Sequence, residues 1–246
     1  LAALIGIPYS YSTPLAYART NVEGTLNVLQ AARDAGVGLT VHTSTSEVYG
    51  TARFVPMDEE HPLQGQSPYS ASKIGADKLA EAFHASFDLP VVVVRPFNTY
   101  GPRQSARAII PTITTQCLVG ETVSLGNLHP TRDLNYVANI VEGFLLAATT
   151  PAVVGQTINL GSGREINIRE LAQLIARLAG KPISIEGDEQ RVRPGNSEVE
   201  RLLADNAVAG SLLGWKPVVG LEEGLGRTID WMVENLDRYR PGVYVA

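Results

Sequence analysis

The sequence predicts an α/β fold with a parallel sheet, on three observations. Helical and strand patterns alternate along the first hundred residues, and this succession indicates βαβ units. Residues 39–43 are rich in β-branched side chains and predict a strand that leads into a hydroxyl-rich stretch. Residues 89–94 form an apolar run bounded by Pro90 and Pro96, which is typical of a strand covered on both faces.

Local signals place two helices in the same region. Thr20 and Glu23 have the spacing of a capping box, and the helix that they start is expected to end near residue 36. Ser67 followed by Pro68 predicts the N-cap and first turn of a second helix. This second helix is rich in alanine and is expected to run to about residue 87.

Beyond residue 100 the pattern is looser, and we place a soft boundary there between regions 1–100 and 101–246. Asn167 followed by Glu170 resembles a capping box, and the residues after it predict a helix with one apolar face. The charged run 186–200 predicts a loop. The other expected elements are helices at 106–118, 136–148, 205–213 and 221–236, and strands at 122–125, 157–160 and 183–185.

Composition narrows the class of protein. The chain has 246 residues, 44% of them hydrophobic, which is enough to bury a substantial core. Its formal net charge is -5 and no basic run occurs, so we expect no nucleic-acid partner. Cys117 is the one cysteine and the four histidines are scattered, which predicts no disulfide and no metal site. Without a signal sequence or a run long enough to cross a bilayer, we expect a soluble cytoplasmic protein with no membrane partner.

Two short stretches carry most of the reactive side chains. The first, residues 43–50, reads Thr-Ser-Thr-Ser-Glu-Val-Tyr-Gly and follows a predicted strand, where open α/β sheets place their sites. In the second, Tyr69 and Lys73 lie four residues apart on a predicted helix and so share a face. A nearby ammonium favours the phenolate, which makes the pair a usable acid/base. Alone, this spacing more often means a surface tyrosine beside a solvated lysine.

Together with three other patches, these stretches resemble one known family. The patches are Leu1-Ala2-Ala3, Asn21-Val22-Glu23-Gly24-Thr25, Ser44 to Gly50 with Tyr69 and Lys73, Arg95 to Pro102, and Thr131-Arg132-Asp133. On them the chain resembles the extended short-chain dehydrogenases/reductases, specifically the NAD-dependent nucleotide-sugar epimerases and dehydratases. The resemblance covers nearly the whole chain. It implies a Rossmann-like doubly wound parallel sheet with a smaller C-terminal substrate-binding lobe.

A glycine-rich phosphate loop is not found in this sequence. No Gly-x-x-Gly-x-x-Gly motif precedes a helix, although a dinucleotide-binding sheet carries such a loop after its first strand. We therefore expect that loop and the first strands of the sheet to lie upstream of Leu1. Residues 1–100 would then be the C-terminal part of the dinucleotide-binding domain. Residues 101–246 would be mainly the substrate-binding lobe, with some segments returning to the first domain.

The resemblance also assigns catalytic roles. It implies that Thr45, Tyr69 and Lys73 are the catalytic hydroxyl, base and lysine. Glu47 corresponds to the glutamate that removes the proton from sugar C5 in 4,6-dehydratases, a position where 4-epimerases usually carry no acid. Ser46 stands where dTDP-glucose dehydratases have an aspartate, which leaves open the acid that protonates the departing water. The alternative for Glu47 is a solvated loop carboxylate.

The same resemblance implies tightly held NAD, with NADP left open, and a nucleotide-sugar substrate. The residues expected to contact the cofactor are Leu1, Ala2, Ala3, Asn21, Thr43, Ser44, Tyr69, Lys73, Pro96 and Asn98. Those expected to contact the substrate are Thr45, Asn98, Arg132 and Arg193. The two arginines suit bidentate phosphate contacts; their alternative is a surface ion pair with Asp133 or Glu198. Helices 20–35 and 68–87 would pair with a second copy in a homodimer.

The expected activity is nucleotide-sugar 4,6-dehydration. In this reaction C4 is oxidised, water is eliminated across C5 and C6, and hydride returns to C6. Gly65 to Tyr69 followed by Arg95 to Arg103 is similar to the UDP-N-acetylglucosamine 4,6-dehydratases of nonulosonic-acid pathways. A UDP-sugar 4-epimerase and a UDP-glucuronate decarboxylase stay open as enzyme alternatives. The alternative from another class is an inactive fragment or a module that only binds nucleotide-sugar.

Overall fold

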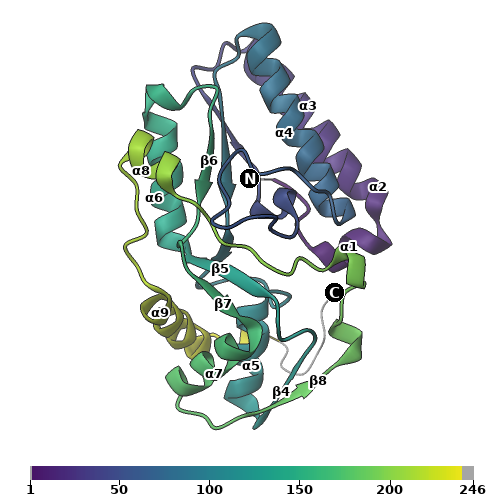
Figure 1. Ribbon diagram of the computed structural model, residues 1–246, viewed down its shortest axis with the longest axis vertical. Helices are drawn as coiled ribbons and strands as arrows, with labels where there is room; N and C mark the ends of the chain where they lie inside the picture. The colour runs from purple at the N-terminus through teal and green to yellow at the C-terminus, as the bar shows by residue number, and fades with distance from the viewer. Residues whose placement is uncertain (1, 240–246) are drawn as a thin grey trace.

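A computed structural model describes residues 2–239, and its first sheet is parallel throughout (Figure 1). The sheet consists of β1 (Thr40–Thr43), β2 (Val91–Pro96) and β6 (Thr157–Leu160), in the order β1-β2-β6. Val41 pairs with Val92, and Val93 pairs with Thr157. The parallel α/β sheet predicted from the alternating pattern is therefore confirmed.

Helices cover both faces of this sheet (Figure 1). On one face, α3 (Gly24–Asp34) and α4 (Pro68–Phe87) pack on Val91 and Val93. On the other, α6 (Val137–Thr149) and α8 (Ala207–Leu213) pack on the alternate residues of β2. Because successive side chains of a strand point to opposite faces, this double cover explains why β2 is apolar without interruption.

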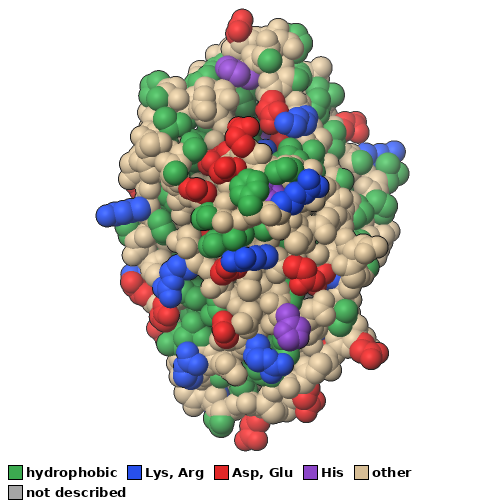
Figure 2. Space-filling model, viewed as in Figure 1, with side chains coloured by type: hydrophobic (Ala, Val, Ile, Leu, Met, Phe, Trp, Pro, Cys, Tyr) green, Lys and Arg blue, Asp and Glu red, His purple; other side chains and the backbone are tan. Residues whose placement is uncertain are grey.

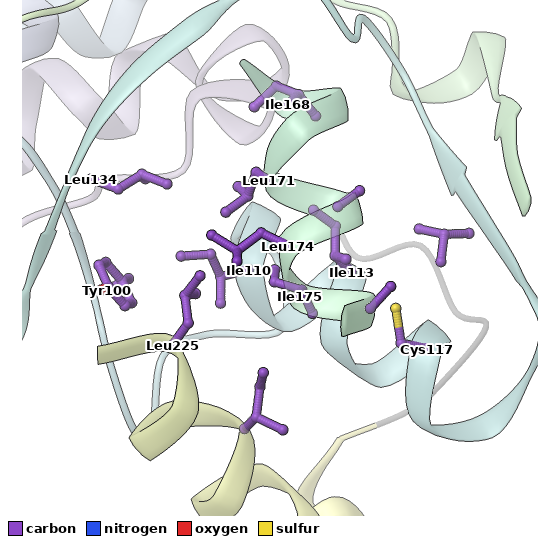
Figure 3. Packing of buried hydrophobic residues seen from close by; sticks show 14 of the residues in the cluster. Tyr100, Ile110, Ile113, Cys117, Leu134, Ile168, Leu171, Leu174, Ile175 and Leu225 are labelled. Carbon is purple, nitrogen blue, oxygen red and sulfur yellow. The ribbon is translucent and has the colours of Figure 1, made fainter. Parts of the chain in front are cut away.

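Two small sheets and three further helices form a second core. One sheet contains β3 (Asn98–Tyr100), β5 (Thr131–Tyr136) and β7 (Glu165–Asn167), and the other contains β4 (Thr122–Leu125) and β8 (Ser184–Gly187). Their core is formed with α5 (Ile109–Val119), α7 (Ile168–Leu178) and α9 (Leu221–Glu234). Figure 3 shows the apolar side chains of α7 pointing toward those of α5, with Leu225 and Tyr100 beside them.

Two predicted helix starts are confirmed and one is wrong. The Asn167 side chain accepts a hydrogen bond from Glu170 N–H at 2.8 Å, so α7 has the predicted N-cap. The Ser67 hydroxyl accepts a hydrogen bond from Ser70 N–H at 3.1 Å, so α4 has the predicted N-cap. The predicted start at Thr20 is wrong, because the chain is already helical through α2 (Pro14–Tyr17) and a π-helix, Ala18–Glu23. The sequence also missed α1 (Ile7–Ser12). Within residues 2–239, five short 3-10 helices complete the list: Ser46–Tyr49 (η2), Pro151–Val153, Glu189–Arg191, Gly195–Ser197 and Leu236–Arg238.

An extended segment that the sequence did not predict, residues 198–205, joins the two halves. Its backbone bonds to the loop after residue 50, where Ala52 N–H donates to Arg201 O at 3.2 Å. It also bonds to β5, where Thr131 N–H donates to Glu200 O at 2.9 Å. This segment therefore holds the hydroxyl-rich stretch close to β5.

Segments after the predicted boundary near residue 100 return to the first sheet. The elements α6, β6 and α8 all lie after it and pack on or in the first sheet. The division into residues 1–100 and 101–246 stays a prediction. Among the residues that the structure describes, no helix is long and apolar enough to cross a membrane, and no cluster of potential metal ligands occurs. On the face shown in Figure 2, acidic and basic side chains are interspersed.

Two glycines of α9 provide a matched test of this packing. A methyl group at Gly224 would meet the Tyr100 hydroxyl and the Tyr136 ring, whereas one at Gly226 would meet no atom within 4 Å. We expect Gly224→Ala to lower the free energy of unfolding by about 1–3 kcal/mol through overpacking. We expect Gly226→Ala to raise it by up to about 1 kcal/mol through helix propensity. Urea unfolding measures both, and equal effects would contradict the packing described.

Candidate active site

The hydroxyl-rich stretch begins where β1 ends, at the carboxyl edge of the parallel sheet. This edge is where open α/β sheets place their ligands. The stretch turns into a short 3-10 helix, η2, capped by the Thr45 hydroxyl, which accepts a hydrogen bond from Glu47 N–H at 3.2 Å. The tight turn ends at Gly50, whose φ of 64° lies in the left-handed region. Ser46 and Glu47 are therefore both held in buried positions.

Tyr69 and Lys73 face this stretch from the first two turns of α4. Both side chains are buried. The Lys73 ammonium donates a hydrogen bond to Thr43 O at 2.6 Å, and the Tyr69 hydroxyl is hydrogen-bonded to the Thr45 side chain. The structure thus brings Thr43, Thr45, Tyr69 and Lys73 together at one strand end.

The charge state of this pair is set mainly by burial. Burial raises the pKa of Tyr69 above its usual value, the bond to Thr45 lowers it, and the Glu47 charge raises it. Burial lowers the pKa of Lys73, and the charge of Asp77 opposes that effect. The sequence predicted that Lys73 lowers the pKa of Tyr69. The net shift is upward, because desolvation is the largest effect and the phenolate loses more than the uncharged phenol when water is excluded.

The carboxylate of Glu47 has no hydrogen-bond partner within residues 2–239, although the side chain is only 7% exposed. The Glu47 charge raises the pKa of Arg132, against a larger lowering by burial. It also raises the pKa of Tyr69. The Glu47 charge therefore acts on Tyr69 and on Arg132, while its carboxylate oxygens remain free to accept a hydrogen bond or a proton. A solvated loop carboxylate would not have these neighbours.

Arg132 and Arg193 converge on one carboxylate. Arg132 Nη2 donates to Glu198 Oε1 at 3.1 Å, and Arg193 Nη1 donates to the same oxygen at 3.4 Å. Asn127 Nδ2 donates to Glu198 Oε2 at 3.1 Å. The ion pair with Glu198 is thus present, but Arg132 and Glu198 are buried rather than on the surface. Two guanidinium groups are consequently fixed side by side, beyond Glu47.

Asp133 has a different role from the one considered for it. Its two carboxylate oxygens accept hydrogen bonds from the backbone N–H groups of Ser162, Gly163 and Ala204. It therefore ties β5 to the β6–β7 loop and to the extended segment 198–205, and it does not pair with either arginine. Burial raises the pKa of Asp133, and these hydrogen bonds lower it.

One residue expected to contact the cofactor, Asn21, also holds protein groups in place. Asn21 Nδ2 donates to Leu4 O and to Ser72 Oγ, both at 2.9 Å, and Asn21 Oδ1 accepts from Leu4 N–H. Asn21 thus fixes the segment that carries Ala2 and Ala3 against α4. Leu1, which belongs to the same patch, lies outside the described residues.

Pro96 ends β2, and Asn98 follows it at the start of β3. Asn98 Oδ1 is buried and has no hydrogen-bond partner among residues 2–239. A buried acceptor without a donor is costly unless something else satisfies it. Asn98 therefore fits a position that hydrogen-bonds a ligand.

A buried polar network lies behind the site, and the sequence analysis missed it. The Asp77 carboxylate accepts hydrogen bonds from Ser44 Oγ at 2.7 Å and from Arg95 Nη2 at 3.2 Å. His42 Nε2 lies 3.0 Å from Asp77 Oδ1. Ser44, expected at the cofactor, is thus engaged with α4. The signal was available, because Asp77 continues the four-residue spacing of Tyr69 and Lys73 along the same helix.

Comparisons with known proteins identify a family and several similar enzymes. The profile of the GDP-mannose 4,6 dehydratase family matches residues 1–228. The chain is similar to the UDP-glucose 4-epimerase of Mycolicibacterium smegmatis, with 35% identity over 237 residues, 94% of this chain and 74% of that protein.

Two solved structures are also similar. DesIV from Streptomyces venezuelae, a dTDP-glucose 4,6-dehydratase with NAD bound, has a TM-score of 0.87 and 33% identity, covering 97% of this chain and 73% of DesIV. RMD from Pseudomonas aeruginosa, complexed with NADPH, has a TM-score of 0.86 and 29% identity, covering 95% of this chain and 80% of RMD. The parallel sheet, the Tyr69–Lys73 pair at its carboxyl edge and the profile that spans nearly the whole sequence lead to one conclusion: this chain belongs to the GDP-mannose 4,6 dehydratase family, among the extended short-chain dehydrogenases/reductases.

Proposed function

We propose that the protein is a nucleotide-sugar 4,6-dehydratase. The observation that carries this proposal is Glu47, a buried carboxylate with free oxygens next to the Tyr69–Thr45 pair. Two bases in one site suit two successive proton removals from neighbouring carbons. A 4-epimerase has no use for the second base.

The residues present fit a nicotinamide cofactor. The buried Asn98 Oδ1 atom lacks a hydrogen-bond donor. Lys73 donates one hydrogen bond to Thr43 O, and its two other N–H groups can bind a ribose hydroxyl. Thr43, Lys73, Pro96 and Asn98 would hold the group, with Ala2, Ala3 and Asn21 supporting it. When bound, the oxidised nicotinamide supplies a reversible hydride acceptor for sugar C4. We propose NAD, and NADP stays an alternative.

The chain's own groups divide the remaining chemistry. Tyr69, assisted by the neighbouring Lys73 charge, removes the proton of the C4 hydroxyl, and the Thr45 hydroxyl hydrogen-bonds the C4 oxygen. The C4 ketone acidifies the C5 proton, which Glu47 removes. Water then leaves from C6. Ser46 is buried on the same turn as Glu47, and its place makes it a candidate to guide the proton to the departing hydroxyl.

The substrate proposal is a UDP-sugar, specifically UDP-N-acetylglucosamine. Arg132 and Arg193 supply two fixed guanidinium groups for the diphosphate, and Asn98 supplies a further polar contact. The sugar assignment rests on the resemblance around Tyr69 and Arg95. The main rival is a UDP-sugar 4-epimerase, which the similarity to the Mycolicibacterium smegmatis protein favours. UDP-glucuronate decarboxylation, and nucleotide-sugar binding without turnover, are the other rivals.

The first test separates the two bases. In deuterated water, the unaltered enzyme is expected to release a product that is lighter by one water and carries solvent deuterium at C5. Glu47→Gln keeps the side-chain shape and is expected to reduce this elimination by at least about a hundredfold, a typical loss for a missing general base. Mass spectrometry of the product measures both effects.

The matched variant for this test is Tyr69→Phe, which should block oxidation at C4 as well as water loss. Glu47→Gln should still form the C4 ketone. Turnover of Glu47→Gln equal to that of the unaltered enzyme would refute the dehydratase proposal. A product of unchanged mass without C5 deuterium would identify a 4-epimerase, and loss of carbon dioxide would identify a decarboxylase.

A second test concerns the paired arginines. Glu198→Ala leaves two guanidinium groups without their buried partner, so we expect a loss of about 3 kcal/mol in the free energy of unfolding and a higher KM for the nucleotide-sugar. The control is Glu223→Ala, which breaks an exposed i,i+4 pair with Arg227 and should cost no more than about 0.5 kcal/mol. Similar losses in urea unfolding would show that Glu198 does not hold the arginines.

We also propose a homodimer through α3 and α4, which lie side by side in Figure 1. Val28 on α3 and Phe87 on α4 are large apolar side chains that are 61% and 50% exposed. Burying them against a second copy would remove this apolar surface from water. Val28→Glu should shift sedimentation from dimer to monomer, whereas Val218→Glu, at an exposed valine outside α3 and α4, should not. A monomer before substitution would contradict the proposal.

A further inference from the structure

Asp77 is a completely buried carboxylate that the proposed chemistry leaves unused. It lies in α4, four residues after Lys73 and eight after Tyr69, and residues at this spacing share one helix face. The three side chains therefore form a stripe along the face that α4 turns toward the sheet. The stripe begins at the Thr45 hydroxyl and ends behind β1.

The position of the Asp77 carboxylate is fixed from two strands. Ser44 Oγ donates to its Oδ2 at 2.7 Å, and His42 Nε2 lies 3.0 Å from its Oδ1. Arg95 of β2 donates from Nε at 3.3 Å and from Nη2 at 3.2 Å, both to Oδ2. Because His42 and Ser44 flank Thr43, these hydrogen bonds also fix the Thr43 carbonyl, which accepts the hydrogen bond from Lys73.

The titratable groups that act on the stripe come from several elements around it. They are Lys73 and Tyr69 on α4 itself, His42 on β1, Arg95 on β2, Glu47 on η2 and Tyr17 on α2. Asp77 is the charge that raises the pKa of Lys73 against the lowering by burial. The same charge raises the pKa of Tyr69.

We propose that Asp77 is a positioning residue for the Tyr69–Lys73 pair: its buried negative charge keeps the Lys73 ammonium charged, and its bonds to β1 place the Thr43 carbonyl that orients it. This inference rests on the proposed function, in which Lys73 must carry its proton while Tyr69 acts as a base. An ammonium in a dry site tends to lose its proton unless an anion compensates. The alternative is a purely structural role, in which Asp77 only compensates the buried charge of Arg95.

The two roles give different pH profiles. Asp77→Asn keeps the side-chain shape but removes the charge, so the pKa values of Tyr69 and Lys73 should both fall. The two limbs of the kcat profile report the titration of this pair, so both limbs should move toward acid pH. The maximum kcat should fall by roughly tenfold to a hundredfold, as for a misplaced catalytic group. A structural role would lower kcat without moving either limb.

Two controls keep the negative charge. Asp77→Glu retains the carboxylate at a shifted position, and His42→Gln retains Asp77 together with a hydrogen-bond donor. Both profiles should keep the limbs of the unaltered enzyme. If Asp77→Asn does not fold because Arg95 is left unpaired, the double variant Asp77→Asn/Arg95→Gln removes both buried charges. Its reference is Arg95→Gln alone, which keeps Asp77, and the limbs of the double variant should lie at more acid pH than those of Arg95→Gln.

A second measurement does not depend on turnover. Ultraviolet absorbance of the phenolate is followed against pH in Asp77→Asn and in the unaltered protein, each compared with its own Tyr69→Phe derivative to isolate Tyr69. Tyr69 should titrate at lower pH once Asp77 is neutral. An unshifted titration together with unshifted limbs would overturn this inference even in an active dehydratase. A shifted titration in a protein without dehydratase activity would leave the inference standing and refute the proposed function.

Discussion

The close approach of α4 to the first sheet is the constraint on which the rest of the site depends. Ala76 and Ala80 are fully buried, and Ala80 packs in the same cluster as Val91 and Val93. Small side chains let the helix axis lie near the strands. This close packing lets Lys73, in the second turn of α4, reach the backbone carbonyl of Thr43 at the end of β1. The alanines therefore determine where the reactive groups meet, although they touch no reactive atom.

Much of this arrangement could be predicted from the sequence, because the signals are local. The Ser67–Pro68 start fixes α4 to the residue, and the apolar run at residues 89–94 identifies a strand covered on both faces. The spacing of Tyr69 and Lys73 on a helix then places both side chains on one face. These signals depend only on neighbouring residues, so the elements that they predict are present in the structure.

Other parts depend on long-range contacts and gave no local signal. The strands β3 and β7 have three residues each and are stable only through pairing with β5. The extended segment 198–205 contains charged residues that predict a loop, yet its backbone is paired on both sides. Ser44 and Asn21 match family positions at a cofactor, but their side chains hold α4 and the N-terminal segment. The hydrogen bonds of Ser44 and Asn21 to distant residues could not be predicted from these motifs, and their contact with a cofactor stays a prediction.

The distribution of buried charge gives the site its polarity. Four cationic side chains, Lys73, Arg95, Arg132 and Arg193, lie in or beside the site with the carboxylates of Asp77, Glu198 and Glu47. Asp77 and Glu198 are each shared by hydrogen-bonded partners, whereas the Glu47 carboxylate has no such partner within the described residues.

Arg132 and Arg193 share the single carboxylate of Glu198, so the hydrogen-bonded groups at that end of the site carry one positive charge in excess. An anionic diphosphate would be drawn to that end and would leave the sugar between Tyr69 and Glu47. The two bases carry like charge once both are ionised, and the Glu47 charge already raises the pKa of Tyr69. Proton removal at C4 is therefore harder while Glu47 is charged. In the dehydratase that we propose, Glu47 offsets this cost by removing the second proton, which is the requirement that separates dehydration from epimerisation.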